Sequence, residues 1–75
     1  MATWEVALFA YHRERHGDNV SVEAEPTVGA ILGALAAAGL NVSSCRLAVN
    51  SEFASITENV AEGSEIALIP PVSGG

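Results

Sequence analysis

The change from strand to helix that decides the fold lies in residues 19–40, which read NVSVEAEPTVGAILGALAAAGL. From Asn19 to Glu25 apolar and polar residues alternate, which is typical of a strand with one buried and one solvated face. Pro26 stops this strand, and Thr27 can accept the first amide hydrogen bond of a following helix. The sequence therefore predicts a strand that leads directly into a helix.

One buried stripe is expected along this helix. Its apolar residues keep the i, i+3, i+4, i+7 spacing of a helix face that packs on a core: Val28, Ile31, Leu32 and Leu35. Gly39 suits the left-handed position that closes a helix, and Leu40 can make the apolar contact beyond it. Gly29 and Gly33 each lower helix stability by about 1 kcal/mol relative to alanine, a cost that close packing of the helix on a sheet would explain.

The residues before position 19 are expected to form a second strand, 3–10, antiparallel to the first. Alternation divides it into two faces, with Trp4, Val6 and Leu8 inward and Ala7, Phe9 and Tyr11 outward. Residues 12–18 are a charged connector that ends in Gly17-Asp18, a turn signal.

After the helix, strands are expected at 46–50, near 53–54 and at 65–69, with one helical turn at 57–61. Alternation places a set of apolar residues inward: Cys45, Leu47, Val49, Ile66 and Leu68. Ala67 and Ile69 are left on the outward face.

The predicted element order is β-β-α-β-β in one α+β domain that spans residues 1–75, with 70–75 as an extended, flexible tail. One helix covers only one face of a sheet, so the other face must be solvated or meet a partner. Phe9 and Ile69 fall on that uncovered face, and Phe53 can join them. We therefore expect a partner-binding patch made of Phe9, Phe53 and Ile69.

Composition excludes several classes of function. Nine acidic residues face three arginines and no lysine, for a formal net charge of −6. A chain without a basic stripe does not suit nucleic acid or an anionic membrane surface. No signal peptide is evident, and the apolar segment 28–40 is too short to span a bilayer, so a cytoplasmic location is expected.

No side-chain cluster in the sequence resembles a catalytic or metal site. His12 and His16 have the i, i+4 spacing of a metal pair, but no third ligand is evident, and no metal is expected. Cys45 is the one cysteine, which excludes an internal disulfide and is most simply a small core residue. Arg46 is expected on the outward face of its strand. An enzyme that acts alone is therefore the least expected class.

The tail carries the candidate chemistry. It reads Pro70-Pro71-Val72-Ser73-Gly74-Gly75. The two prolines cannot donate to a sheet ladder, so the last strand must stop before them and the chain must leave extended. The two glycines lack side chains and can thread a narrow channel in another protein. ATP can convert the Gly75 carboxylate to an acyl-adenylate, from which a sulfur nucleophile displaces AMP to leave a thiocarboxylate.

The ending EIALIPPVSGG, residues 65–75, resembles that of the small subunit of molybdopterin synthase, a ubiquitin-like sulfur carrier family. Leu8-Phe9-Ala10 and Ala48-Val49-Asn50 are similar to the same family, and the resemblance covers essentially the whole chain. Two features depart from the family pattern: Arg15 stands where a leucine is usual, and the segment 41–44 is too short for the extra helix of longer relatives.

The resemblance implies a β-grasp fold, with a mixed sheet on one main helix and the last strand parallel to the first. It implies a large-subunit partner in a heterotetramer, a ubiquitin-activating-type adenylating enzyme that uses ATP, and a sulfur donor such as a cysteine desulfurase or rhodanese. In this family the Gly75 thiocarboxylate would deliver sulfur to cyclic pyranopterin monophosphate inside the large subunit, while residues 70–74 thread that subunit's active site. No bound cofactor is implied.

Two alternatives share the same activated terminus. One is a sulfur carrier for thiamine, cysteine or tRNA thiolation, and the other is a ubiquitin-like modifier joined to lysines of other proteins. The absence of lysine prevents chains built through this protein's own side chains, which disfavours a polymerising modifier.

Overall fold

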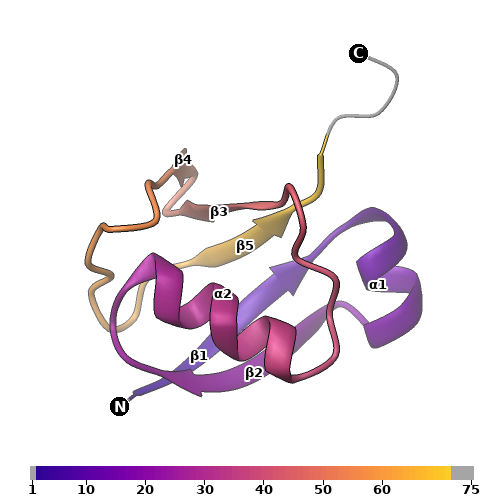
Figure 1. Cartoon of the computed structure of the whole chain (residues 1–75), viewed down its shortest axis with the longest axis horizontal. Helices are drawn as coiled ribbons and strands as arrows, with labels where there is room; N and C mark the ends of the chain where they lie inside the picture. The colour runs from indigo at the N-terminus through magenta and orange to yellow at the C-terminus, as the bar shows by residue number, and fades with distance from the viewer. Residues whose placement is uncertain (1, 72–75) are drawn as a thin grey trace.

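The computed structural model describes residues 2–71, except for the side chain of Tyr11, and within them five strands form one mixed sheet. The strands are β1 (Ala2–Leu8), β2 (Asn19–Ala24), β3 (Arg46–Val49), β4 (Glu52–Phe53) and β5 (Ile66–Ile69). Their spatial order is β2-β1-β5-β3-β4 (Figure 1). β1 is antiparallel to β2 and parallel to β5, while β3 is antiparallel to both of its neighbours. The expected α+β, β-grasp arrangement is confirmed.

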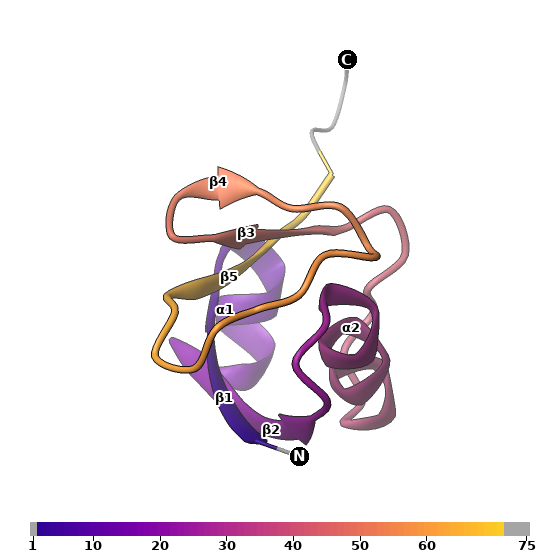
Figure 2. The ribbon, with the colours of Figure 1, turned by 90° about the vertical axis from the view of Figure 1, so that its left-hand side faces the viewer.

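The main helix, α2 (Val28–Ala37), lies across one face of this sheet (Figure 2). Thr27 is its N-cap, and the Thr27 hydroxyl accepts a hydrogen bond from the Ala30 amide at 3.2 Å. At the other end Gly39 has a φ of 101°, and the Leu40 amide donates to the Leu35 carbonyl at 3.1 Å. This is the Schellman closure that the Gly39-Leu40 pair predicts. Val28, Ile31 and Leu35 are buried as predicted, whereas Leu32 is only half-buried.

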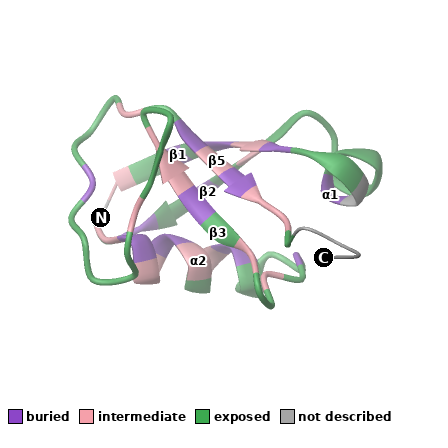
Figure 3. Ribbon diagram, turned by 90° about the horizontal axis from the view of Figure 1, so that it is seen from above, coloured by how far each residue is buried: buried purple, intermediate pink, exposed green. Residues whose placement is uncertain are grey.

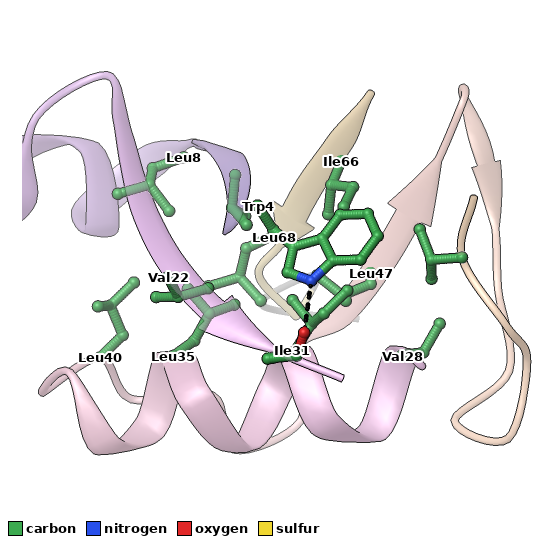
Figure 4. Packing of buried hydrophobic residues seen from close by; sticks show 13 residues of the cluster. Trp4, Leu8, Val22, Val28, Ile31, Leu35, Leu40, Leu47, Ile66 and Leu68 are labelled. Carbon is green, nitrogen blue, oxygen red and sulfur yellow. Dashed lines mark hydrogen bonds between the residues drawn. The ribbon is translucent and has the colours of Figure 1, made fainter. Parts of the chain in front are cut away.

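The core lies between α2 and the sheet face that α2 covers (Figure 4). The adjacent strands β1 and β5 contribute their inward residues to this core, and Val60 joins it from the loop before β5. The Trp4 indole nitrogen donates to the Ala24 carbonyl at 3.0 Å, so the one polar atom of this large side chain is satisfied inside the core. The buried apolar residues are Trp4, Val6, Leu8, Val22, Ala24, Val28, Ile31, Leu35, Leu40, Leu47, Val60, Ile66 and Leu68.

The connector predicted at 12–18 is wrong, because residues 10–16 form a helix, α1 (Ala10–His16). α1 follows the end of β1, so the first strand stops at Leu8 rather than at position 10 (Figure 1). The His12 side chain is fully buried, although the residues around it are charged. Gly17 then ends the helix with a φ of 95°, where its amide donates to the Arg13 carbonyl at 2.9 Å.

The helical turn predicted at 57–61 is also wrong. This segment is irregular, and carbonyls of Ile56, just before it, and of Glu58, within it, accept hydrogen bonds from the start of α2. The Gly29 amide donates to the Ile56 carbonyl at 2.9 Å, and the Val28 amide donates to the Glu58 carbonyl at 3.0 Å. These bonds satisfy two of the helix amides that have no partner within α2.

Gly29 is explained by the same contact and not by packing on the sheet. A Cβ there would lie 3.2 Å from the Ile56 carbonyl oxygen, which is too close without a backbone shift. A Cβ on Gly33 would meet no atom within 4 Å, so packing does not explain that glycine.

Candidate protein-docking groove

The sheet face opposite α2 carries a groove with a floor of small residues. Ala7 pairs with Ala67 across β1 and β5, and Ala67 pairs with Ala48 across β5 and β3. All three alanines are half-buried and alternate with buried core residues along their strands. Figure 3 shows this alternation of burial along the strands. Three small side chains in a row leave a hollow that larger residues border.

The apolar end of the groove is formed by the three residues predicted as a partner-binding patch. Phe9, Phe53 and Ile69 line one hollow of about 300 Å³ together with Ala48 and Ala67. Phe9 and Phe53 are 44% and 55% exposed, which is unusual for phenylalanine and leaves both rings available to another protein. The structure therefore brings Phe9, Phe53 and Ile69 together, and their role in binding stays a prediction.

Arg46 extends the patch at the outer strands. It pairs with Ile69 in the ladder, and its guanidinium carbon lies 4.1 Å from the centroid of the Phe53 ring. This cation–π contact holds the phenyl ring in place over the outward face of β3. Arg46 thus lies on the outward face, as alternation predicts, whereas its contact with Phe53 has no signal in the sequence.

The other end of the groove is acidic. Glu5 and Glu65 line a contiguous hollow of about 520 Å³ that shares Phe9, Ala48 and Ala67 with the apolar end. This acidic end and the alanine floor are not among the predicted site residues. Strand parity was a sufficient signal for both, because residues 5, 7, 65 and 67 share the outward phase of Phe9 and Ile69.

The tail begins at the apolar end of the groove. Ile69 is the last residue of β5, so Pro70 and Pro71 follow directly from a residue that lines the groove. Pro70 is half-buried and Pro71 is exposed. The predicted tail residues Val72, Ser73, Gly74 and Gly75 lie outside the described residues.

His12 and Cys45 form a contact outside the groove. The Cys45 sulfur lies 3.6 Å from His12 Nε2 and also 3.6 Å from the Asn41 carbonyl oxygen. Burial lowers the pKa of His12, and the positive charge of His16 lowers this pKa further. Burial also raises the pKa of the Cys45 thiol, which keeps the sulfur protonated and unreactive at neutral pH.

This contact argues for a packing role for both residues. His12 is buried while His16 is exposed on the same helix, and both line a small hollow with Gly39 and Asn41. Among residues 2–71 no group of three or more metal-ligating side chains is found.

Stability should fall at mildly acidic pH because of His12. Its pKa is lower in the folded protein than the ordinary 6.5, so the unfolded chain binds more protons below that pH. His12 should therefore not lower the free energy of unfolding above about pH 6.5. Below that pH the free energy of unfolding should decrease, by at most about 1.4 kcal/mol per pH unit for this one group.

Urea titrations between pH 7.5 and 5.5 measure this slope. His12→Gln should flatten it. His16→Gln is the matched control and should retain most of the slope, since burial is the larger cause of the lowered pKa. Equal slopes for the wild type and His12→Gln would contradict the assignment.

None of the helices within residues 2–71 is long and apolar enough to cross a membrane.

Comparison with known proteins agrees with this fold. The model of the ThiS family matches residues 6–75. A search of the curated proteins gives no match. Two crystal structures of small archaeal modifier protein 1 (SAMP1) from Haloferax volcanii are similar, at 35% and 33% identity. Each has a TM-score of 0.70, and the alignments cover 99% and 96% of this chain and all of that one.

The fold is also similar to a chain in the complex of subunits 1 and 2 of molybdopterin-converting factor from Helicobacter pylori. The identity is 22% and the TM-score 0.68, over 99% of this chain and all of that chain. At this identity the likeness shows the fold alone. The family match covers nearly the whole sequence, and the chain therefore belongs to the ThiS family of ubiquitin-like sulfur carriers and modifiers.

Proposed function

We propose that this protein is the sulfur-carrying small subunit of a molybdopterin synthase. Its groove docks on the large subunit, and its tail delivers a Gly75 thiocarboxylate into the large subunit's active site. There the sulfur is transferred to cyclic pyranopterin monophosphate. The resemblance of residues 65–75 to that family is the source of the substrate assignment.

The observation that carries the proposal is the position of the groove at the base of the tail. Ile69 lines the groove, and Gly75 follows six residues later. An extended chain of six residues reaches roughly 20 Å. A partner that covers Phe9, Phe53 and Ile69 would therefore hold the start of the tail, while the terminal carboxylate reaches a site well inside that partner.

The chemistry requires other proteins. A ubiquitin-activating-type enzyme uses ATP to form the Gly75 acyl-adenylate with release of pyrophosphate. The persulfide sulfur of a donor such as a cysteine desulfurase or rhodanese then displaces AMP to give an acyl disulfide. A second thiol cleaves the S–S bond of this acyl disulfide, which leaves the Gly75 thiocarboxylate and a disulfide on the donor. This chain needs no bound cofactor, because its role is to present the tail to the partner enzymes.

Two further observations support a large-subunit partner. The similar fold in Helicobacter pylori was solved as a complex of two subunits of molybdopterin-converting factor. The exposed phenylalanines, with a guanidinium stacked on Phe53, have the aromatic and arginine composition of protein interfaces. A heterotetramer with the large subunit is the assembly we propose.

A second candidate function is a protein modifier. The 35% identity to SAMP1, a small archaeal modifier protein, favours it. The same activated Gly75 would then form an amide with a lysine of another protein. Carriers for thiamine, cysteine or tRNA thiolation share the activation step and differ in the recipient.

The intact mass of the protein tests the carrier chemistry. After incubation with the adenylating enzyme, ATP and a sulfur donor, we expect a gain equal to the replacement of one oxygen by sulfur, located at Gly75. The thiocarboxylated protein should then convert cyclic pyranopterin monophosphate only when a molybdopterin synthase large subunit is present.

The outcomes separate the candidates. Turnover in a thiazole or tRNA thiolation system, without turnover with the large subunit, would reassign the recipient. An unchanged mass, with the activating enzyme competent on another carrier, would refute sulfur carriage. Gly-Gly remnants on lysines of cellular proteins would support the modifier.

A further inference from the structure

The acidic end of the groove is lined by two glutamates from adjacent strands, Glu5 and Glu65. Glu5 and Glu65 each precede a paired residue, since Val6 pairs with Ile66 across the parallel strands β1 and β5. Val6 and Ile66 are buried, so the residues before them point to the outward face, where both line the groove. Neighbouring strands lie about 4.8 Å apart, so the two acidic side chains start from adjacent backbone positions on the same face.

Both residues are held by neighbours. The Glu5 carboxylate accepts a hydrogen bond from the Ser21 hydroxyl of β2 at 3.0 Å. The Glu65 amide donates to Asn50 Oδ1 at 2.9 Å, and the Glu65 carbonyl accepts from the Asn50 amide at 2.8 Å. Asn50 itself has a φ of 53°. The Glu5 carboxylate and the Glu65 backbone are thus each fixed by a neighbouring residue on the rim of the groove.

None of the three arginines lines this end of the groove. Arg15 lines a separate hollow with His12 and Gly39. Arg13 forms an ion pair with Asp18 at 2.8 Å, beside the end of α1. Arg46 stacks on Phe53, and it pairs with Ile69, four positions along β5 from Glu65. Four strand positions span about 13 Å, so Arg46 marks the opposite end of the groove.

The groove is therefore apolar at one end, acidic at the other, and floored by alanine. We propose that Glu5 and Glu65 receive a lysine or arginine of the large-subunit surface that covers the groove, next to an apolar side chain seated over Ala67. This inference rests on the proposed function and deepens it, because it adds, at the rim of an apolar docking surface, two carboxylates that recognise a cationic side chain. Such a rim fixes orientation and accelerates association more than it adds affinity.

The charge balance of the whole chain favours this occupant. A net charge of −6 attracts a basic protein surface at long range, and the paired carboxylates give that attraction a fixed docking point. A partner without a cation at that position would bury the two carboxylates unpaired, so the pair contributes to partner specificity.

The test compares two double variants with the same change in charge. E5Q/E65Q removes both rim charges, and the side-chain amide oxygen introduced by E5Q can still accept the hydrogen bond from Ser21. E14Q/E58Q is the matched control, since Glu14 and Glu58 are exposed and do not line the groove. Binding to the purified large subunit is measured by stopped-flow association and by calorimetry at several salt concentrations.

For E5Q/E65Q we expect an association rate constant about tenfold lower at low salt, with a flatter dependence on salt. The control should change by less than about twofold, and both variants should keep the wild-type melting temperature.

Equal losses in the two double variants would overturn the inference, because net charge alone would then account for the effect. Unchanged association in E5Q/E65Q would overturn it as well. In both cases binding by the wild type leaves the proposed function intact. A wild-type protein that does not bind the large subunit would overturn the proposed function together with the inference.

Discussion

Deletion of Gly75 should abolish thiocarboxylate formation while the melting temperature stays that of the wild type. The variant still ends in a carboxylate, but on Gly74, one residue short. Within residues 2–71 the buried core ends at Leu68, and the deletion changes none of its residues. The activating enzyme must place one specific carbonyl carbon against ATP, and a displacement of one residue, roughly 3.5 Å, removes it from that position.

The measurement is intact mass after the adenylation and sulfuration reaction, together with single-turnover sulfur transfer. Ser73→Ala is the matched control: it alters the tail but keeps both glycines and the chain length, and it should retain most of the transfer. We expect a loss of at least about a thousandfold for the deletion, comparable to removal of an essential reacting group. Sulfur transfer that persists after the deletion would refute the proposed chemistry.

The alternation of apolar and polar residues along the strands predicted most reliably which side chains are buried. Burial on one face makes a slip of one residue costly, because it would move every apolar side chain to solvent. For that reason the inward positions Trp4, Leu47 and Leu68 could be assigned from alternation alone, and all three are buried. The Thr27 cap and the Gly39 closure were equally readable, since each depends on one residue and its local backbone.

The two wrong predictions, at α1 and at residues 57–61, concern segments whose conformation depends on residues elsewhere in the chain. In α1 the only buried side chain that the structure describes is His12, so no apolar periodicity marks the helix. Several hydrogen-bond partners of the segment 54–61 lie at or just before the start of α2, such as the Gly29 amide. Propensity within the segment cannot report partners that lie about thirty residues earlier in the chain.

The candidate site was predictable in part. Phe9, Phe53 and Ile69 were assigned to one face from parity and from their size, and the structure confirms that they lie together. The groove itself depends on the register that aligns Ala48 with Ala67, which a single sequence does not give. Large apolar residues on an exposed face indicate a binding patch, whereas the small residues that form the floor of a groove give no such signal.

Leu8 and Phe9 are consecutive, yet aspartate should have opposite effects at the two positions. Leu8 is 2% exposed and lies among the core residues of β1 and its neighbours. A carboxylate there would be buried without a partner, at a cost of about 3–5 kcal/mol or more. A domain of this size has a total stability of roughly 4–11 kcal/mol, so Leu8→Asp should be largely unfolded at 37 °C.

Phe9→Asp should fold and lose its partner. Phe9 is the N-cap of α1 with extended backbone angles, and its side chain makes no capping hydrogen bond. Aspartate is a preferred N-cap, worth about 0.5–2 kcal/mol, which offsets the packing that the half-exposed ring gives up. The same change places a charge in the apolar end of the groove, and we expect the Kd for the large subunit to rise by at least about tenfold.

Circular dichroism melts and calorimetric titration of each variant with the large subunit separate the two effects. Each substitution is the control for the other, because both add one aspartate at the same end of β1. A Phe9→Asp variant that fails to fold would place Phe9 in the core, and one that binds with wild-type affinity would remove it from the docking surface. A folded Leu8→Asp variant would contradict the register of β1 against β5, and with it the face on which the groove is built.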